Sequence, residues 1–171
     1  VWVFFDSDHL YVVCRCSESR PERIVANEMR RDNNNIVQQD HFAFVIDTFY
    51  DRRNGFLFET TPVGARFDGQ ITNERFDGNV NPVWEVKVGR FDGGWAVEAA
   101  VPFKSLRYRQ AGAQIWGFNA RRNSTWKNEQ SFLAPIPASR VNQALSQASL
   151  AATLAGVEIP EGSRNLEIKP Y

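Results

Sequence analysis

The stretch of residues 40–69, DHFAFVIDTFYDRRNGFLFETTPVGARFDG, decides the fold. Residues 41–47 are apolar and rich in aromatic and β-branched side chains, which is typical of a strand. A polar loop follows and ends in Asn-Gly, a dipeptide that tolerates positive φ. Residues 56–61 resume the strand pattern until Pro62, which cannot donate a ladder hydrogen bond, and residues 65–71 begin a third strand. The stretch predicts an antiparallel meander with acidic and amide side chains at its turns.

More short strands are predicted on both sides of this meander. Alternation of apolar and polar residues predicts strands over residues 2–5, 10–16, 84–88, 95–101, 114–123 and 131–135. Single helical turns are expected within residues 19–27 and 102–106, and surface loops over residues 29–39 and 73–82. Many short strands at hairpin spacing, with little helix, predict an all-β fold, a two-sheet antiparallel β-sandwich of the jelly-roll kind.

Composition narrows the class of partner. The chain has 171 residues, enough for one well-buried domain, and 43% of them are apolar. Twenty basic residues balance twenty acidic ones, which argues against nucleic acid or an acidic membrane surface as the main partner. No apolar run approaches the roughly 20 residues of a membrane-spanning helix. Because strand-like residues begin at Val1, we expect a fragment or a processed form.

Cysteine and histidine are scarce and favour structural roles. Cys14 and Cys16 face the same side of one predicted strand, an awkward geometry for a disulfide, and no further Cys or His ligand is evident nearby. Both are predicted to be small buried hydrophobic side chains. His41 stands at the start of an apolar strand, where we expect it to be buried in a structural role.

The central stretch also carries a family resemblance. Its pattern, DxFxxxIDTFxDxRNxxxFxxxPxGxRxDG over residues 40–69, resembles the family 9 carbohydrate-binding modules. It is most similar to the version at the N-terminus of a bacterial outer-membrane barrel family of unknown function. The likeness continues at residues 84–88, 94–98, 101–103, 106–107 and 116–122, and it ends at residues 166–171, where such proteins pass into the barrel.

This resemblance implies an architecture and a setting. Residues 1–156 would form the β-sandwich, with a closing strand near the end of residues 144–154, and residues 157–171 would be a linker and the start of the following barrel. The implied location is the cell envelope of a Gram-negative-type bacterium, on the periplasmic or outer surface of the outer membrane. The implied partners are a glycan and the barrel of the same protein. A domain that only packs on its barrel or on a partner protein, without binding sugar, remains the alternative.

Catalysis is not predicted. The chain lacks the sequence motifs of the serine hydrolases, zinc proteases, phosphate-binding loops and dinucleotide-binding folds. A glycosidase needs two carboxylates across a cleft, and nothing in the spacing of the acidic residues pairs any two of them. The sequence therefore favours binding without catalysis.

Sugar binding needs a flat aromatic face with planar polar groups at its rim. Trp126 is the first candidate, because it stands among polar residues that offer it little core to join. Trp84, which follows a loop, is the second, although its alternating strand also fits a core position, as do those of Trp95 and Trp116. The expected polar rim consists of Arg66, Arg122, Asn123 and Glu129. In the modules that the chain resembles, two tryptophans clamp the sugar.

A structural calcium ion is a further expectation. Ca²⁺ takes six to eight oxygen ligands from carboxylates, amides and carbonyls. Asp47, Asp51 and Asn54 surround one loop, and Asp68 lies on a neighbouring predicted strand. The resembling modules bind calcium structurally, which supports this set of ligands. The alternative is that Asp51 and Asn54 only bond the backbone of the turn.

Overall fold

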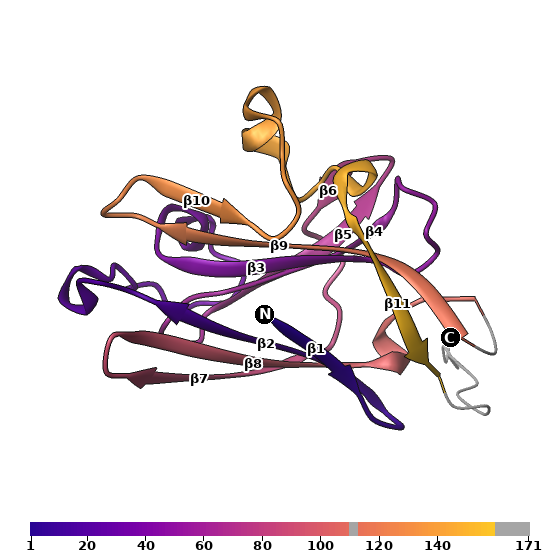
Figure 1. Ribbon diagram of the computed structural model, residues 1–171, viewed down its shortest axis with the longest axis horizontal. Coiled ribbons are helices and arrows are strands. Elements are labelled where there is room, and N and C mark those ends of the chain that lie inside the picture. Colours follow the sequence, from indigo (N-terminus) through magenta and orange to yellow (C-terminus); the bar gives the residue numbers. More distant parts are fainter. Residues whose placement is uncertain (110–112, 160–171) are drawn as a thin grey trace.

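A computed structural model of the protein describes residues 1–109 and 113–159, which form two antiparallel sheets packed face to face (Figure 1). The four-stranded sheet has the order β1 (Trp2–Phe5), β2 (His9–Ser17), β8 (Gly94–Pro102), β7 (Glu85–Phe91). The main path of the seven-stranded sheet is β10 (Glu129–Phe132), β9 (Ala113–Ser124), β3 (His41–Asp47), β4 (Gly55–Thr60), β5 (Arg66–Thr72), β6 (Arg75–Asp77). Its remaining strand, β11 (Ala152–Glu158), pairs with β9 beside β10. The predicted β-sandwich is confirmed.

Helix is confined to short 3-10 turns. They are η1 (Pro21–Arg23), η2 (Asn34–Gln38), η3 (Phe103–Ser105), η4 (Ala138–Gln143) and η5 (Ala148–Leu150). The first and third confirm the two predicted helical turns. In the part of the chain that the structure describes, no helix has the length and apolar character needed to cross a membrane.

The main core lies between the sheets and is rich in aromatic side chains. In β3, Phe42, Phe44 and Ile46 alternate toward this core, as the period of two in a strand requires. Phe44 stacks on Phe58 with ring centroids 5.1 Å apart, and the edge of Trp84 meets Phe58 at 5.2 Å. Aromatic pairs at these separations stabilise the core beyond the area they bury.

The seven-stranded sheet is covered on its outer face as well, which explains why every residue of β3 is buried. Ala43 and Val45 point away from the main core and join Leu57, Ile71 and Leu145 in a second apolar cluster. Leu145 belongs to the segment between β10 and β11, which rises from the outer side of this sheet in Figure 1. A strand buried on both faces carries a continuous apolar run rather than alternation, and residues 41–47 show this.

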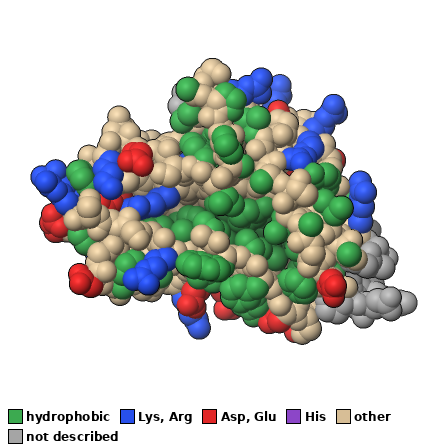
Figure 2. Space-filling model, viewed as in Figure 1, with side chains coloured by type: hydrophobic (Ala, Val, Ile, Leu, Met, Phe, Trp, Pro, Cys, Tyr) green, Lys and Arg blue, Asp and Glu red, His purple; other side chains and the backbone are tan. Residues whose placement is uncertain are grey.

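One open edge of the sandwich is apolar. In Figure 2 hydrophobic side chains gather in a band between the two layers, on the side where β1 and β11 lie in the matching view of Figure 1. Val3 of β1 and Leu154 of β11 are half buried and pack against the main core. The core therefore reaches the surface along this edge.

The structure differs from the sequence prediction in several places. The predicted loop 73–82 contains β6, because Gly69 has no Cβ and Phe76 can lie over it and stack on Phe67 at 5.4 Å. The predicted loop 29–39 contains η2, which buries Ile36. The last strand runs past the expected boundary at residue 156 to Glu158, since Val157 belongs to the core. The expected start of a following segment, after residue 159, lies outside the described residues.

The scarce cysteines and His41 are placed as predicted. Cys14 and Cys16 are buried and unbridged, with their sulfur atoms 3.6 Å apart. His41 is buried at the start of β3. Its Nδ1 lies 2.9 Å from the carbonyl of Gln39, and its Nε2 lies 2.9 Å from Arg121 Nη2. A neutral imidazole that donates from Nδ1 and accepts at Nε2 satisfies both contacts. Burial, followed by the charge of Arg121, lowers the pKa of His41 to about 3, which agrees with the neutral form.

Glu59 completes this buried cluster. Its Oε2 accepts a hydrogen bond from Arg121 Nη2 at 3.1 Å, while its Oε1 has no hydrogen-bond donor within the described residues. Burial raises the pKa of Glu59 to about 7, although the Arg121 guanidinium acts in the opposite direction. A buried carboxylate with one unpaired oxygen favours the protonated form.

Glu59 should make the stability of the domain depend on pH. The pKa of Glu59 is higher in the folded protein than its ordinary value of 4.5, so its stabilising contribution is complete below pH 4.5 and is lost as pH rises through about 7. We expect Glu59→Gln to abolish this loss of stability with rising pH. Urea unfolding at several pH values would measure the free energy of unfolding of both proteins. The exposed Glu85→Gln variant controls for the lost negative charge. Parallel stability curves for wild type and Glu59→Gln would contradict the prediction.

Candidate functional site

Trp126 lies in the turn that joins β9 to β10, half buried and outside both apolar clusters. The backbone N–H of Asn128 donates to the carbonyl of Thr125 at 3.0 Å, and Asn128 adopts a φ of 51°, which Asn tolerates. The indole Nε1 is buried and has no acceptor among the described residues. Unlike Trp84, Trp95 and Trp116, which are core residues, Trp126 is therefore partly accessible at one corner of the sandwich.

Three cations surround the Trp126 ring. The charged groups of Lys127, Arg23 and Arg20 lie 5.2, 5.4 and 5.7 Å from its ring centroid. A cation within about 6 Å of an indole centroid is attracted by the negative ring face. Arg20 and Arg23 come from the turn after β2, so this site joins two parts of the chain that are distant in sequence. We call it the Trp126 corner, formed by Glu18, Arg20, Arg23, Arg122, Trp126 and Lys127.

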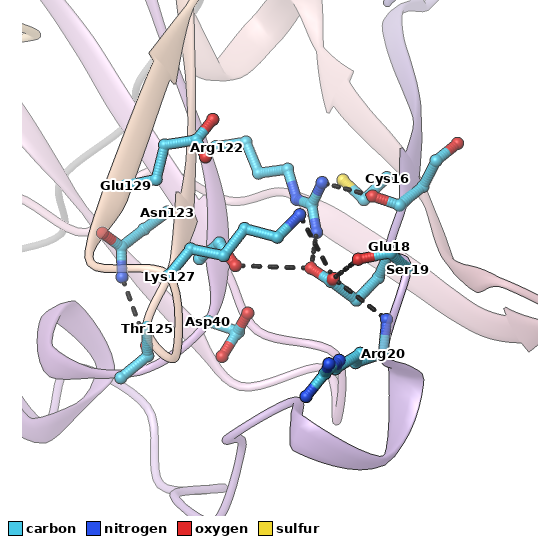
Figure 3. Close-up of polar contacts among 12 residues, drawn as sticks. Cys16, Glu18, Ser19, Arg20, Asp40, Arg122, Asn123, Thr125, Lys127 and Glu129 are labelled. Atoms are coloured by element: carbon cyan, nitrogen blue, oxygen red, sulfur yellow. Dashed lines mark hydrogen bonds and ion pairs between the residues drawn. The ribbon is translucent and has the colours of Figure 1, made fainter.

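A buried carboxylate organises the Trp126 corner (Figure 3). Glu18 is 3% exposed, and its Oε2 lies 2.9 Å from Arg122 Nη2. Its Oε1 lies 3.3 Å from Lys127 Nζ and accepts the backbone N–H of Arg20 at 3.2 Å. Ser124 donates to Oε2 at 3.3 Å. Both oxygens of Glu18 are thus bonded by groups from β9, the β9–β10 turn and the turn after β2.

These donors keep Glu18 ionised. Burial acts to raise its pKa, but the Arg20 N–H and then Lys127 and Arg122 outweigh burial and lower the pKa to about 2. The carboxylate therefore holds Lys127 and Arg122 in place at neutral pH.

The predicted polar rim is only partly brought together. Arg122, Asn123 and Glu129 belong to the β9–β10 hairpin, whose turn contains Trp126. Arg122 also donates to the carbonyl of Ser17, and Asn123 donates to the carbonyl of Gln39 at 2.8 Å, so both side chains are bonded to the protein. Glu129 is exposed and accepts a hydrogen bond from Ser131 at 3.1 Å.

Arg66 lies apart from the Trp126 corner. It donates to the carbonyl of Trp84 at 2.7 Å and lines a separate groove of about 580 Å³ with residues of β2, β7 and β8 such as Tyr11, Lys87 and Glu98. The prediction that Arg66 shares a rim with Trp126 is therefore corrected by the structure.

Trp84 is also not a surface residue. It is 1% exposed, and its Nε1 donates to Asp68 Oδ2 at 2.8 Å. Arg31 Nη2 donates to Asp68 Oδ1 at 2.8 Å, so this carboxylate accepts hydrogen bonds from both an indole and a guanidinium. Trp84 is therefore buried with its polar atom bonded, and it offers no ring face to a sugar. This corrects its place among the candidate sugar-binding residues.

The four predicted calcium ligands do not form one group. Asp68 points into the core with Trp84, whereas Asp47 is on the opposite face of the sheet and accepts the N–H of Arg52 at 2.7 Å. Asp51 accepts the N–H of Asn54 and its side-chain amide, at 2.9 and 2.6 Å. Across residues 1–109 and 113–159, no cluster of three or more His, Cys, Asp or Glu side chains could hold a metal ion. In this structure the Asp51 carboxylate accepts hydrogen bonds from N–H groups of its own turn.

Sequence reasoning missed Glu18, Arg20 and Arg23. Residues 19–27 predicted a helical turn, but nothing in their pattern pointed toward Trp126, more than 100 residues away in sequence. The charged pair Glu18–Arg20 next to a predicted strand end was the one available signal. Such pairs are common on solvated surfaces, so it had little weight.

Comparison with known proteins identifies the fold. No family model matches the chain, and no curated protein matches it. Among solved structures, the chain is similar to a family 9 carbohydrate-binding module from Caldicellulosiruptor kristjanssonii in complex with cellotriose, with a TM-score of 0.64 and 14% identity. That match covers 98% of this chain and 78% of that chain. Similarity at this level of identity shows a shared fold.

Two further structures agree. The glucose complex of a family 9 module from the same organism has a TM-score of 0.61 and 15% identity, covering 97% of this chain and 78% of that chain. A protein from Bacteroides uniformis ATCC 8492, assigned as carbohydrate-binding, has a TM-score of 0.65 and 11% identity and covers 90% of this chain and 75% of that chain. The chain thus has the β-sandwich fold of carbohydrate-binding modules.

Glu18 should be important for stability. Its replacement by alanine would leave Arg122 and Lys127 without their shared carboxylate. Since both cations remain partly solvated, we expect Glu18→Ala to lower the free energy of unfolding by about 2 kcal/mol, below the range for a fully buried pair. Urea unfolding followed by circular dichroism would measure the change.

Two controls make this test specific. Glu129→Ala, at an exposed position on the same hairpin, should change the unfolding free energy by less than about 0.5 kcal/mol. Because the pKa of Glu18 lies below its ordinary value of 4.5, its contribution should be present above pH 4.5 and lost as pH falls through about 2. Equal losses in both variants would contradict the role given to Glu18.

Calcium binding by the Asp47–Asn54 loop is open to a direct test. The oxygens of this loop would have to release their N–H donors before they could coordinate an ion, so we expect calcium to leave the melting temperature unchanged. Thermal unfolding in excess calcium and in EDTA would measure this. A calcium-dependent rise that disappears in Asp51→Asn would instead establish a site in this loop.

Proposed function

We propose that this protein is a non-catalytic carbohydrate-binding domain that holds a sugar against Trp126. The observation that carries the proposal is the position of Trp126, a partly accessible indole in a hairpin turn, ringed by hydrogen-bond donors. An indole face suits the apolar face of a pyranose, and planar polar groups around it suit its hydroxyls. Support from the fold comes from neighbours that include modules in complex with cellotriose and glucose.

In this proposal, five side chains of the β9–β10 hairpin have a role. Trp126 supplies the stacking face, and Lys127 and the exposed Glu129 supply a donor and an acceptor at its rim. Arg122 and Asn123 are already bonded to the protein, so they position the hairpin. A site whose supporting groups are fixed before binding loses less conformational entropy when the ligand arrives.

The cellular setting is also proposed. The sequence resemblance supports a place in the cell envelope of a Gram-negative-type bacterium, before an outer-membrane barrel of the same protein. In that setting the domain would present its Trp126 corner to a glycan on the periplasmic or outer surface.

A protein-interaction role is the second candidate. One observation favours it, the exposure of two large apolar side chains on β1, Trp2 at 58% and Phe4 at 50%. Exposed apolar residues that are contiguous can mark a contact surface for a partner. A domain with this role would pack on its barrel or on another protein and bind no sugar.

Trp126→Ala should abolish sugar binding. Without the indole the ligand loses its stacking face, so the saturable change in tryptophan fluorescence that we expect with one or more sugars of a mono- and oligosaccharide panel should disappear. Calorimetry on the same samples would measure the loss independently of fluorescence, and parallel titrations with and without calcium would separate any effect of the ion.

Trp2→Ala is the matched control, since Trp2 is an exposed tryptophan on the other sheet. This variant should bind like the wild type. Binding that survives Trp126→Ala, or a flat response of the folded wild-type domain across the whole panel, would refute the proposal. The flat response would favour the protein-interaction role.

A further inference from the structure

The charged side chains at and around the Trp126 corner differ in their hydrogen-bond and ion-pair partners. Glu18 and Asp40 are buried, and both already accept hydrogen bonds from the protein, Asp40 from the backbone N–H of Val25 at 2.9 Å. Two further carboxylates lie on the β9–β10 hairpin and on the turn after β2. Glu129 accepts a hydrogen bond from Ser131, and Glu22 is exposed and lies between Arg20 and Arg23 in sequence. Glu18 forms ion pairs with Arg122 and Lys127, whereas Asp40 forms none with the described residues and its Oδ1 has no hydrogen-bond partner among them.

Arg20 and Arg23 differ from the other cations. Both are exposed, and in residues 1–109 and 113–159 neither guanidinium has an ion pair or a hydrogen-bond acceptor. Their contact is with the ring of Trp126, 5.7 and 5.4 Å from its centroid. Two guanidiniums therefore lie over the ring of Trp126 with all of their donors available.

Guanidinium groups select a particular ligand chemistry. Arg presents planar N–H donors that match a carboxylate in a bidentate geometry, and such charge-assisted bonds are about twice as strong as neutral ones. A neutral sugar would leave this capacity unused and would lie near two unpaired positive charges. A ligand that combines a pyranose ring with a carboxylate uses both the indole and the guanidiniums.

We propose that the Trp126 corner selects acidic sugars of the hexuronate class. The sugar ring stacks on Trp126, and its carboxylate binds Arg20 and Arg23, which move from the ring face to the carboxylate. This inference rests on the proposed carbohydrate-binding function and names its ligand class. A simple inorganic anion would meet the guanidiniums but gain nothing from the indole.

The test compares sugars that differ in one group. Calorimetric titrations with glucuronate and glucose, and with short oligomers of each, isolate the effect of the carboxylate. We expect glucuronate to bind about tenfold more tightly than glucose at low salt, and the difference to shrink at high salt. In the double variant Arg20→Gln/Arg23→Gln the two affinities should fall within about twofold of each other.

Arg15→Gln is the matched control. Arg15 is also exposed and lies over an aromatic ring, that of Phe91 at 4.1 Å, but it belongs to the four-stranded sheet. This variant removes the same charge by the same substitution and should keep the wild-type preference for glucuronate. An equal loss of preference in Arg15→Gln would show a general effect of net charge and would overturn the assignment to Arg20 and Arg23.

The remaining outcomes separate this inference from the proposed function. Equal affinity for glucose and glucuronate would overturn the acidic preference and leave carbohydrate binding in place. Absence of binding to every sugar by the folded domain would overturn the proposed function itself. Inorganic sulfate that competes as strongly as glucuronate would overturn the sugar component of the inference, because a site for simple anions needs no stacking face.

Discussion

The contact between Glu18 and Arg122 connects two sheets that share no ladder hydrogen bonds. Most of the interface between the sheets is apolar packing, which is strong but not directional. Trp84, directly before β7, adds hydrogen bonds to Asp68 and Arg66 of β5. At this end of the sandwich a buried carboxylate, at the end of β2, meets a guanidinium from β9 and fixes their separation. The Trp126 corner depends on this contact, because Lys127 and the backbone of Arg20 bond the same carboxylate.

The two tryptophans considered for sugar binding differ in burial and in the partners of their indole nitrogens. Trp84 donates to Asp68, whose charge Arg31 compensates, so its ring is buried with its polar atom bonded. The Nε1 atom of Trp126 has no acceptor among the described residues, although the residue as a whole is half buried. Trp95 and Trp116 are fully buried and also lack an acceptor for Nε1 among these residues. The accessibility of Trp126 therefore follows from its place in the β9–β10 turn and not from its indole nitrogen.

Local pattern predicted most of the fold and little of the site. Strand period and turn residues located β3, β4, β5, β7 and β8, because these signals lie within a few residues of one another. The β6 strand was missed, since it depends on the absence of a side chain at Gly69. The grouping of Arg20 and Arg23 with Trp126, and the separation of Asp68 from Asp47, follow from packing of distant segments. The spacing of residues along a single sequence does not predict contacts between distant segments.

The division between fixed and exposed groups explains how one fold can serve different ligands. The chain shares its sandwich fold with structures that are only 11–15% identical in sequence, because the core of such a fold tolerates exchange of apolar residues. The η1 turn that carries Arg23 buries no residue. Substitutions at Arg20 and Arg23 should therefore have little effect on the core, whereas Glu18 is tied to both sheets. In the proposed function, specificity at this corner would be set by exposed residues on a scaffold that a buried ion pair holds in place.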